Sequence, residues 1–459
     1  MNLETIKNIY FIGIGGIGMS ALARYFLFHK KEVAGYDRVP SELTQKLTEE
    51  GAMIHYEESV HQIPELFKNT KETLVIYTPA IPPEHQEFLY FQENGFSLKK
   101  RAEVLGLITH SSKGLCIAGT HGKTTTSTIL AHLLHQSHIG CNAFLGGISK
   151  NYKTNLLLSN TSPYTVIEAD EYDRSFHWLS PHIAAITSME PDHLDIYGSE
   201  ENYRAGFEKF TSLIQPNGVL LVKEGLPLIP KLQKEVKVYT YSRTQGDFYA
   251  QNVTIENGEI YFDFITPTGK IKNIQLGVPI AINIENSIAA MAISLLVGAT
   301  EEEVRAGIKS YQGVDRRFDF QIKTPKLVFL NDYAHHPAEV RQSISSIKEL
   351  YPDKKITGIF QPHLFSRTQN FYKEFAQSLS LLDKVILMDI YPAREKPIKG
   401  VTSELIFKEL DATVEKKLIK KEELLQYIAE EPIEVLITLG AGDIDTFVPQ
   451  IKNTLKNNL

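Results

Sequence analysis

The stretch LCIAGTHGKTTT at residues 115–126 leads from an apolar run through a glycine-containing turn into a helix-forming segment. Leu115 to Ala118 predicts a buried strand, and we expect the helix to reach about His135. A strand, a glycine-rich turn and a helix in this order form a phosphate loop, in which backbone N–H groups and a lysine hold phosphates. The turn is shortened, because Ile117 stands where the common pattern has a glycine. The stretch predicts binding of a nucleoside triphosphate, and the alternative is a capped helix with an incidental lysine.

Acidic residues follow the next two predicted strands. Glu168-Ala169-Asp170-Glu171 ends the run at 165–169, and Glu190-Pro191-Asp192-His193-Leu194-Asp195 follows the run at 183–188. Carboxylates at strand ends beside a phosphate loop are placed to hold a hard cation such as Mg²⁺. His193 is either a metal ligand or a packed histidine, and its position next to Asp192 favours the ligand.

A second glycine-rich turn lies near the start of the chain. An apolar run at residues 9–14 overlaps GIGGIG at 13–18, and a helix-forming segment follows at 19–28. Asp37 comes nineteen residues after Gly18, at the end of a second short strand. Glycines let a backbone approach a pyrophosphate, and a helix N-terminus offers free N–H groups. The pattern predicts a diphosphate ligand but leaves its nucleotide open, so a dinucleotide-dependent oxidoreductase stays an alternative here.

The last third of the chain repeats one pattern. Four apolar runs, at 327–330, 356–360, 384–388 and 435–439, each end in polar residues, at 331–336, 361–367, 391–395 and 440–443. Ligands of open α/β sheets bind at the carboxyl ends of the strands. The concentration of His and Arg at these ends therefore predicts a third ligand-binding edge.

Length and composition bound the class of protein. The 459 residues suggest about three domains at roughly 150 residues each. Strands alternating with helices predict an α/β fold with mainly parallel sheets, in domains at 1–107, 108–318 and 319–459. A formal net charge of −7 argues against a protein held mainly by nucleic-acid phosphates. Two cysteines without metal-ligand spacing and the absence of a long apolar run predict a cytoplasmic protein that is not inserted into a membrane.

Taken together, the motifs resemble those of the Mur ligases, the ATP-dependent amino-acid ligases of peptidoglycan precursor synthesis. The resemblance spans the chain in order and rests on GTHGKTTT (119–126), EADE (168–171), PDHLD (191–195), Asn283 with Asn286, RRF (316–318) and DYAHHP (332–337). Within the family, GIGGIGM (13–19), the segment QPHLFSRT (361–368) and IYPARE (390–395) are similar to the alanine-adding members. The resemblance implies a Rossmann-like N-terminal domain, a central ATPase domain with a phosphate loop, and a Rossmann-like C-terminal domain.

The reaction that the resemblance implies is amide-bond formation between UDP-N-acetylmuramate and L-alanine. ATP phosphorylates the lactyl carboxylate to an acyl phosphate, the amine attacks it, and phosphate leaves. Two anions approach in the first step, so Mg²⁺ and a lysine are needed to offset repulsion. ATP and Mg²⁺ are thus the expected cofactors, and a monomer or weak homodimer is expected. The first domain would bind UDP, which reverses the dinucleotide interpretation.

The resemblance also implies roles for individual residues. Catalytic roles are expected for Lys123, Glu168, His193, His336 and Arg367, and metal ligation for Thr124, Glu168 and His193. ATP contacts are expected from Gly119, Thr120, His121, Gly122, Lys123, Thr124, Thr125, Asn283, Asn286, Arg317 and Asp332. The nucleotide sugar would contact Gly15, Gly16, Ile17, Gly18, Asp37, Thr78, His193 and His363, and the amino acid would contact Tyr333, His336, Arg367 and Arg394.

Two other functions are compatible with parts of the sequence. A recycling ligase that joins a preformed tripeptide to the same nucleotide sugar would share EADEYD at 168–173, but we expect it to lack the Pro-His-x-x-Ser-Arg-Thr pattern kept here at 362–368. A dinucleotide-dependent oxidoreductase would leave the phosphate loop and its acidic partners without a role.

Glu208 is hypothesised to replace a modified residue of the family. Sister ligases carry a carbamylated lysine about fifteen positions after the metal histidine, and the same count from His193 reaches Glu208 here. A native carboxylate needs no carbamylation, so added bicarbonate should leave the initial rate unchanged. A rate that depends on bicarbonate would contradict this hypothesis.

Overall fold

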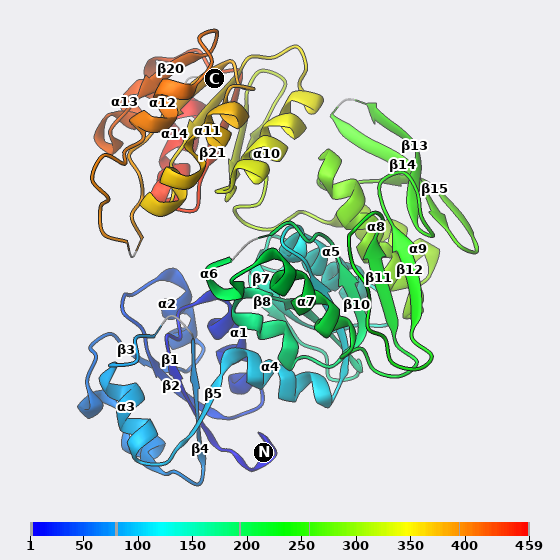
Figure 1. Cartoon of the computed structure of the whole chain (residues 1–459), viewed down its shortest axis with the longest axis vertical. Coiled ribbons are helices and arrows are strands. Elements are labelled where there is room, and N and C mark those ends of the chain that lie inside the picture. The colour runs from blue at the N-terminus through cyan, green and yellow to red at the C-terminus, as the bar shows by residue number, and fades with distance from the viewer. Residues whose placement is uncertain (1–2, 79–80, 192–193, 257, 394, 458–459) are drawn as a thin grey trace. The chain divides into compact units, whose positions relative to one another are not determined.

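The structure is a computed structural model that describes residues 3–78, 81–191, 194–256, 258–393 and 395–457. The chain forms two compact units (Figure 1). The first contains residues 1–253, 261–277 and 284–312, and the second contains 254–260, 278–283 and 313–459. Within the described ranges, no helix is long and apolar enough to cross a membrane.

The N-terminal part of the first unit is a five-stranded sheet in the order β3-β2-β1-β4-β5. All four pairings are parallel. Every residue of the central strand is buried, because helices cover a doubly wound sheet on both faces. The strands are β1 (Asn8–Ile12), β2 (Glu32–Tyr36), β3 (Met53–His55), β4 (Thr73–Tyr77) and β5 (Ser97–Lys100), and the helices are α1 (Ile17–Phe28), α2 (Glu42–Glu49), α3 (Gln86–Glu93) and α4 (Arg101–His110).

A seven-stranded sheet forms the rest of the core of the first unit, in the order β12-β11-β10-β6-β9-β7-β8. Only the edge strand β8 is antiparallel to its neighbour. The strands are β6 (Lys113–Ala118), β7 (Asn142–Ser149), β8 (Thr154–Leu157), β9 (Tyr164–Ala169), β10 (Pro181–Ile186), β11 (Val219–Lys223) and β12 (Lys237–Tyr241). The helices are α5 (Lys123–Gln136), α6 (Leu194–Tyr197), α7 (Glu200–Thr211), α8 (Ala281–Leu296, of which residues 284–296 belong to this unit) and α9 (Glu301–Ser310).

One apolar core joins the two sheets of the first unit. Phe11 of β1 and Phe26 of α1 belong to the same buried cluster as Phe144 of β7 and Ile167 of β9. Helix α1 therefore packs on the N-terminal sheet and on the edge of the central sheet at once. Each Å² of apolar surface removed from water contributes roughly 25 cal/mol of stability. The shared core therefore stabilises the packing of the two sheets against each other.

The second unit contains a six-stranded sheet in the order β16-β17-β21-β18-β19-β20. Its strands pair in parallel except for β16, which is antiparallel to β17. The strands are β16 (Asp319–Lys323), β17 (Val328–Asp332), β18 (Ile356–Phe360), β19 (Lys384–Leu387), β20 (Glu415–Leu418) and β21 (Val435–Leu439), and the helices are α10 (Pro337–Leu350), α11 (Phe365–Leu379), α12 (Glu404–Glu409), α13 (Leu424–Glu430) and α14 (Val448–Asn457).

The predicted α/β fold with mainly parallel sheets is confirmed, and each strand expected from an apolar run is present. A three-stranded sheet of β13 (Tyr249–Glu256), β14 (Glu259–Thr266) and β15 (Gly269–Gln275) completes the fold. The alternating residues 253–262 around the pair Asn257-Gly258 predict a hairpin, and β13 and β14 are neighbours in this sheet; Asn257 itself lies outside the described residues.

Candidate functional site

The turn between β6 and α5 has the backbone of a phosphate-binding loop. Gly119 and Gly122 adopt φ values of +137° and +83°, which other residues rarely reach. A Cβ at Gly119 would lie 2.2 Å from the Thr187 hydroxyl, and one at Gly122 would lie 2.8 Å from Oδ1 of Asn286. Both positions therefore require glycine, because another residue would strain the backbone and its Cβ would collide with a neighbouring side chain.

Neighbouring strand ends fix the two residues between those glycines. The Thr120 hydroxyl donates to the carbonyl of Glu190 (2.7 Å) and lies 2.7 Å from the Tyr203 hydroxyl of α7. The backbone N–H of His121 donates to the Ser188 hydroxyl at 2.6 Å. The loop is thus held in shape by the segment after β10, before any ligand is bound.

Lys123, the first residue of α5, is folded back over the loop. Its ammonium donates to the Gly119 carbonyl (2.6 Å) and to both carboxylate oxygens of Glu171 (2.7 and 3.0 Å). Burial acts to lower the pKa of Lys123, but the carboxylates of Glu171, Asp170 and Glu168 outweigh it and raise that pKa above its ordinary value. Lys123 is therefore held in its charged form, and its ammonium is paired with the Glu171 carboxylate.

Carboxylates gather at the end of β9, as the sequence predicted. Glu168 and Asp170 line a pocket, and Glu171 is buried against Lys123. A Cβ at Gly146 of β7 would lie 2.0 Å from Glu168, so glycine leaves the room that this carboxylate occupies. Asp192 and His193, the other predicted ligands, lie outside the described residues. Among the described residues, no group of three or more His, Cys, Asp or Glu side chains could by itself hold a metal ion.

Two of the predicted ATP contacts, Asn283 and Asn286, lie at the start of α8. Asn286 accepts a hydrogen bond from the Thr126 hydroxyl (3.2 Å) and also abuts Gly122, so it belongs to the loop's surroundings. Asn283 donates to the carbonyl of Val278 at 3.3 Å. Both side chains are buried.

The GIGGIG turn between β1 and α1 is shaped by close contacts as well. The N–H of Gly15 donates to the Asp37 carboxylate at 2.7 Å, so Asp37 braces the loop. A Cβ at Gly18 would lie 2.6 Å from the Arg101 guanidinium. Gly16 precedes the helix as its N-cap and supplies no capping side chain, which leaves the first N–H groups of α1 to other partners.

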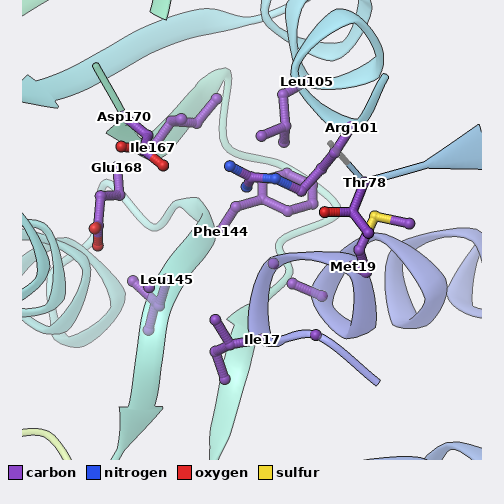
Figure 2. Close-up of a pocket in the computed structure, with 14 residues that line it drawn as sticks. Ile17, Met19, Thr78, Arg101, Leu105, Phe144, Leu145, Ile167, Glu168 and Asp170 are labelled. Carbon is purple, nitrogen blue, oxygen red and sulfur yellow. The ribbon is translucent and has the colours of Figure 1, made fainter. Parts of the chain in front are cut away.

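A pocket of about 290 Å³ opens beside this turn. Arg101 extends into it from α4, with Glu168 and Asp170 on the side away from α4 (Figure 2). Ile17 and Met19 line it from α1, and Phe144 and Leu145 line it from β7. The full lining comprises Gly16, Ile17, Gly18, Met19, Ala21, Thr78, Arg101, Leu105, Phe144, Leu145, Gly146, Ile167, Glu168 and Asp170. The pocket thus has a cationic side, an acidic side and apolar walls.

In the second unit, the predicted edge residues gather at the carboxyl ends of β17, β18, β19 and β21. The rings of His335 and His363 lie 6.0 Å apart, and His363 stacks on Tyr391 at 5.9 Å. The guanidinium groups of Arg316 and Arg317 lie 4.7 and 5.1 Å from the ring centre of Tyr333. Parallel pairing explains why segments far apart in the sequence meet here.

Asp332, His336 and Arg367 lie at the end of β17, at the start of α10 and in α11, and Asp332 is buried. The Asp332 carboxylate accepts from the Ser343 hydroxyl, and burial raises its pKa although Ser343 and Arg317 act in the opposite direction. His336 caps α10 and its ring lies 5.2 Å from that of Phe371. Nη1 of Arg367, on α11, is buried without a hydrogen-bond partner among the described residues. Such a group requires an acceptor, and a bound carboxylate would supply it.

The structure thus groups the predicted residues within each unit. The first unit brings Gly16, Ile17, Gly18, Thr78 and Glu168 to one pocket and residues 119–125 to one loop; Gly15 and Asp37 bond to each other beside that pocket. The second unit gathers Arg317, Asp332, Tyr333, His336, His363 and Arg367. Arg394 lies outside the described residues.

Sequence reasoning missed Arg101 and Phe144. A signal for Arg101 was present, because Lys99-Lys100-Arg101 places positive charge at a helix N-terminus, where the helix dipole disfavours it. Phe144 gave no signal, since a phenylalanine in a strand usually packs in the core. Glu208 forms an ion pair with Lys231 (3.0 Å), and its proposed role stays a prediction.

Three family models match consecutive parts of the chain. They are the Mur ligase family catalytic domain over residues 8–113, the Mur ligase middle domain over 117–294 and the Mur ligase glutamate ligase domain over 316–442.

Similar proteins cover the whole chain. A UDP-N-acetylmuramate–L-alanine ligase of Phocaeicola vulgatus is 64% identical over 451 residues, 98% of each chain. One of Parabacteroides distasonis is 58% identical over 456 residues, 99% of this chain and 98% of that one. The crystal structure of the UDP-N-acetylmuramate–alanine ligase of Thermotoga maritima superimposes with a TM-score of 0.83 at 26% identity, over 98% of this chain and 100% of that one.

A more distant structure shares the fold. The murein peptide ligase of Psychrobacter arcticus matches with a TM-score of 0.69 at 18% identity, over 98% of this chain and 99% of that one. The family models in chain order, and relatives more than half identical along nearly the full length, settle the family: the chain belongs to the Mur ligases.

Proposed function

We propose that the chain joins L-alanine to the lactyl carboxylate of UDP-N-acetylmuramate, with ATP converted to ADP and phosphate. The full-length relatives at 64% and 58% identity carry that activity in their names, which supports this reading of the sequence over the tripeptide-recycling and oxidoreductase alternatives. The observation that carries it is the pocket of the first unit, where the GIGGIG helix start and Arg101 face the acidic end of β9.

The residues of that pocket fit two parts of the nucleotide sugar, the diphosphate and the sugar. The N-terminus of α1 and the Arg101 guanidinium supply positive charge for a diphosphate. The apolar walls from α1 and β7 suit the uncharged parts of the sugar. The predicted sugar-nucleotide contacts Gly15, Gly16, Ile17, Gly18, Asp37 and Thr78 are retained as proposals, and Arg101 is added to them.

The phosphate loop is suited to ATP and Mg²⁺. When bound, ATP supplies the phosphoryl group, and Mg²⁺ offsets the repulsion between two anions. Thr124 and Glu168 offer the hard oxygen ligands that Mg²⁺ prefers, and the space beside Gly146 lets the Glu168 carboxylate enter the pocket. Lys123 would exchange its contact with Glu171 for phosphate oxygens and stabilise the charge that develops on them.

The second unit is proposed to bind the amino acid. Arg367 would pair with the carboxylate of L-alanine through its buried, unpartnered nitrogen. His336 and Tyr333 would orient the amine, which attacks the acyl phosphate, loses a proton and forms the C–N bond as the C–O bond to phosphate breaks. The domain boundaries at 107 and 318, the cytoplasmic location and a monomer or weak homodimer remain part of the proposal.

The proposed reaction is tested by phosphate release with ATP, Mg²⁺ and UDP-N-acetylmuramate, in the presence of either L-alanine or the tripeptide. We expect release with L-alanine and none with the tripeptide alone. Release only with the tripeptide would move the chain to the recycling branch. No release with either would contradict the proposed reaction.

Replacing the loop lysine should abolish turnover. Lys123→Ala removes the positive charge that offsets the phosphates, so we expect kcat to fall on the order of a hundredfold or more. Lys209→Ala, at an exposed position of the same unit, serves as the control for loss of a lysine and should keep the normal rate. Near-normal ADP formation by Lys123→Ala would show that the loop does not bind the transferred phosphate.

Arg367→Ala should weaken binding of the amino acid alone. A hydrogen bond to a charged group contributes about 1.5–3 kcal/mol, so the KM for L-alanine should rise roughly ten- to a hundredfold, while the KM values for ATP and the nucleotide sugar change little. Arg341→Ala, an exposed arginine of α10, is the matched control. Equal rises in all three KM values would argue that Arg367 supports the fold rather than the amino acid.

A further inference from the structure

The pocket of the first unit has two walls that come from different sheets. One wall is the first turn of α1, with Ile17, Gly18 and Met19, and the other is β7, with Phe144 and Leu145 (Figure 2). Helix α1 connects β1 and β2 of the N-terminal sheet, whereas β7 belongs to the central sheet. The width of the pocket therefore depends on how α1 is seated against the β7–β8 hairpin.

Apolar packing alone does not fix the position of α1 relative to β7 and β8. The facing surfaces contribute Phe26 of α1, Phe144 of β7 and Leu156 of β8 to one buried cluster. Apolar contacts are non-directional, so a helix can shift along such a surface with little loss of buried area. A hydrogen bond restricts both distance and angle, and it can set the position that apolar packing leaves open.

Asn155 of β8 provides such a contact. It is fully buried, and it lies next to Leu156, which pairs with Phe144 across the hairpin. Its amide nitrogen donates to the Ile17 carbonyl at 2.5 Å and lies 3.0 Å from the Ser20 hydroxyl. Ile17 is itself a lining residue of the pocket, so the Asn155 side chain connects one wall to the strand pair that forms the other.

The oxygen of the same amide bonds to a third residue of α1 and, through it, to Glu50. It accepts a hydrogen bond from the Arg24 guanidinium at 2.6 Å, and Arg24 in turn donates to both carboxylate oxygens of Glu50 at 2.8 and 2.9 Å. Three residues of α1, Ile17, Ser20 and Arg24, thus satisfy both ends of the Asn155 amide. A buried amide whose bonds all lead to one helix holds that helix in a single orientation.

We propose that Asn155 is a positioning residue for the nucleotide-sugar pocket. It holds the first turn of α1 at the distance from β7 that a bound UDP-N-acetylmuramate requires, and it touches neither the ligand nor the reacting atoms. The identity of the ligand rests on the proposed function, whereas the positioning role rests on the contacts of Asn155 alone. Sequence reasoning gave no sign of it, because an asparagine in a strand carries no motif.

Asn155→Ala removes all three contacts and keeps the backbone. We expect the KM for UDP-N-acetylmuramate to rise about tenfold, with kcat and the KM values for ATP and L-alanine within about twofold of the wild type. Arg24→Ala removes one of the three contacts and leaves those to Ile17 and Ser20, so it should shift the same KM by less. If Asn155→Ala does not fold, the selective shift must still be present in Arg24→Ala.

Asn8→Ala is the matched control, because Asn8 is also a buried asparagine whose amide donates to a backbone carbonyl, that of Leu66 at 2.8 Å. It lies at the start of β1, whereas the GIGGIG turn follows the end of that strand. We expect a loss of thermal stability similar to that of Asn155→Ala, with unchanged KM values. Equal KM shifts in both variants, or none in Asn155→Ala, would overturn the positioning role.

Calorimetric titration of UDP-N-acetylmuramate alone separates this proposal from the proposed reaction. A wild-type protein that binds the nucleotide sugar but releases no phosphate with L-alanine would refute the reaction, and the ratio of Kd values between Asn155→Ala and wild type would still decide the role of Asn155. A wild-type protein that does not bind the nucleotide sugar would refute both.

Discussion

Parallel strand pairing is the constraint on which the candidate site depends. Ala118, the last residue of β6, pairs with Ala169 on β9 and with Ile186 on β10, so three strands end at the same level of the sheet. The phosphate loop, the carboxylates after β9 and the hydroxyls after β10 therefore meet at one edge. The same rule in the second unit brings His335, His363 and Tyr391 together from separate segments.

The candidate site also requires that side chains approach the backbone of the two glycine-rich loops closely. Gly119, Gly122 and Gly18 each occupy a position where a Cβ would collide with a neighbouring side chain. The atoms that would collide are the Thr187 hydroxyl, the Asn286 amide and the Arg101 guanidinium. Glycine thus serves two purposes here: it permits the turn, and it lets polar side chains approach the loops that hold phosphates.

Sequence reasoning succeeded where a strong local signal was present. The strands it identified are mostly buried, such as β6, β9 and β21. Because buried strands consist mainly of apolar residues, each of them forms an apolar run that predicts a strand. The strands it missed lie at or near sheet edges and are short or polar, such as β5 with SLKK and β20 with EKKL. Edge strands keep polar residues that discourage pairing with other chains, and this removes the apolar signal.

The sequence by itself determined the α/β class, the two glycine-rich turns, the polar strand ends and the family, because each depends on residues adjacent in the chain. Only the tertiary structure decided that Lys123 pairs with Glu171, that Arg101 fills the space left by Gly18, and that Asn155 reaches Ile17. These pairs are separated by between 48 and 138 positions. Such contacts arise from the order of strands in a sheet and the seating of helices on it, which no local pattern encodes.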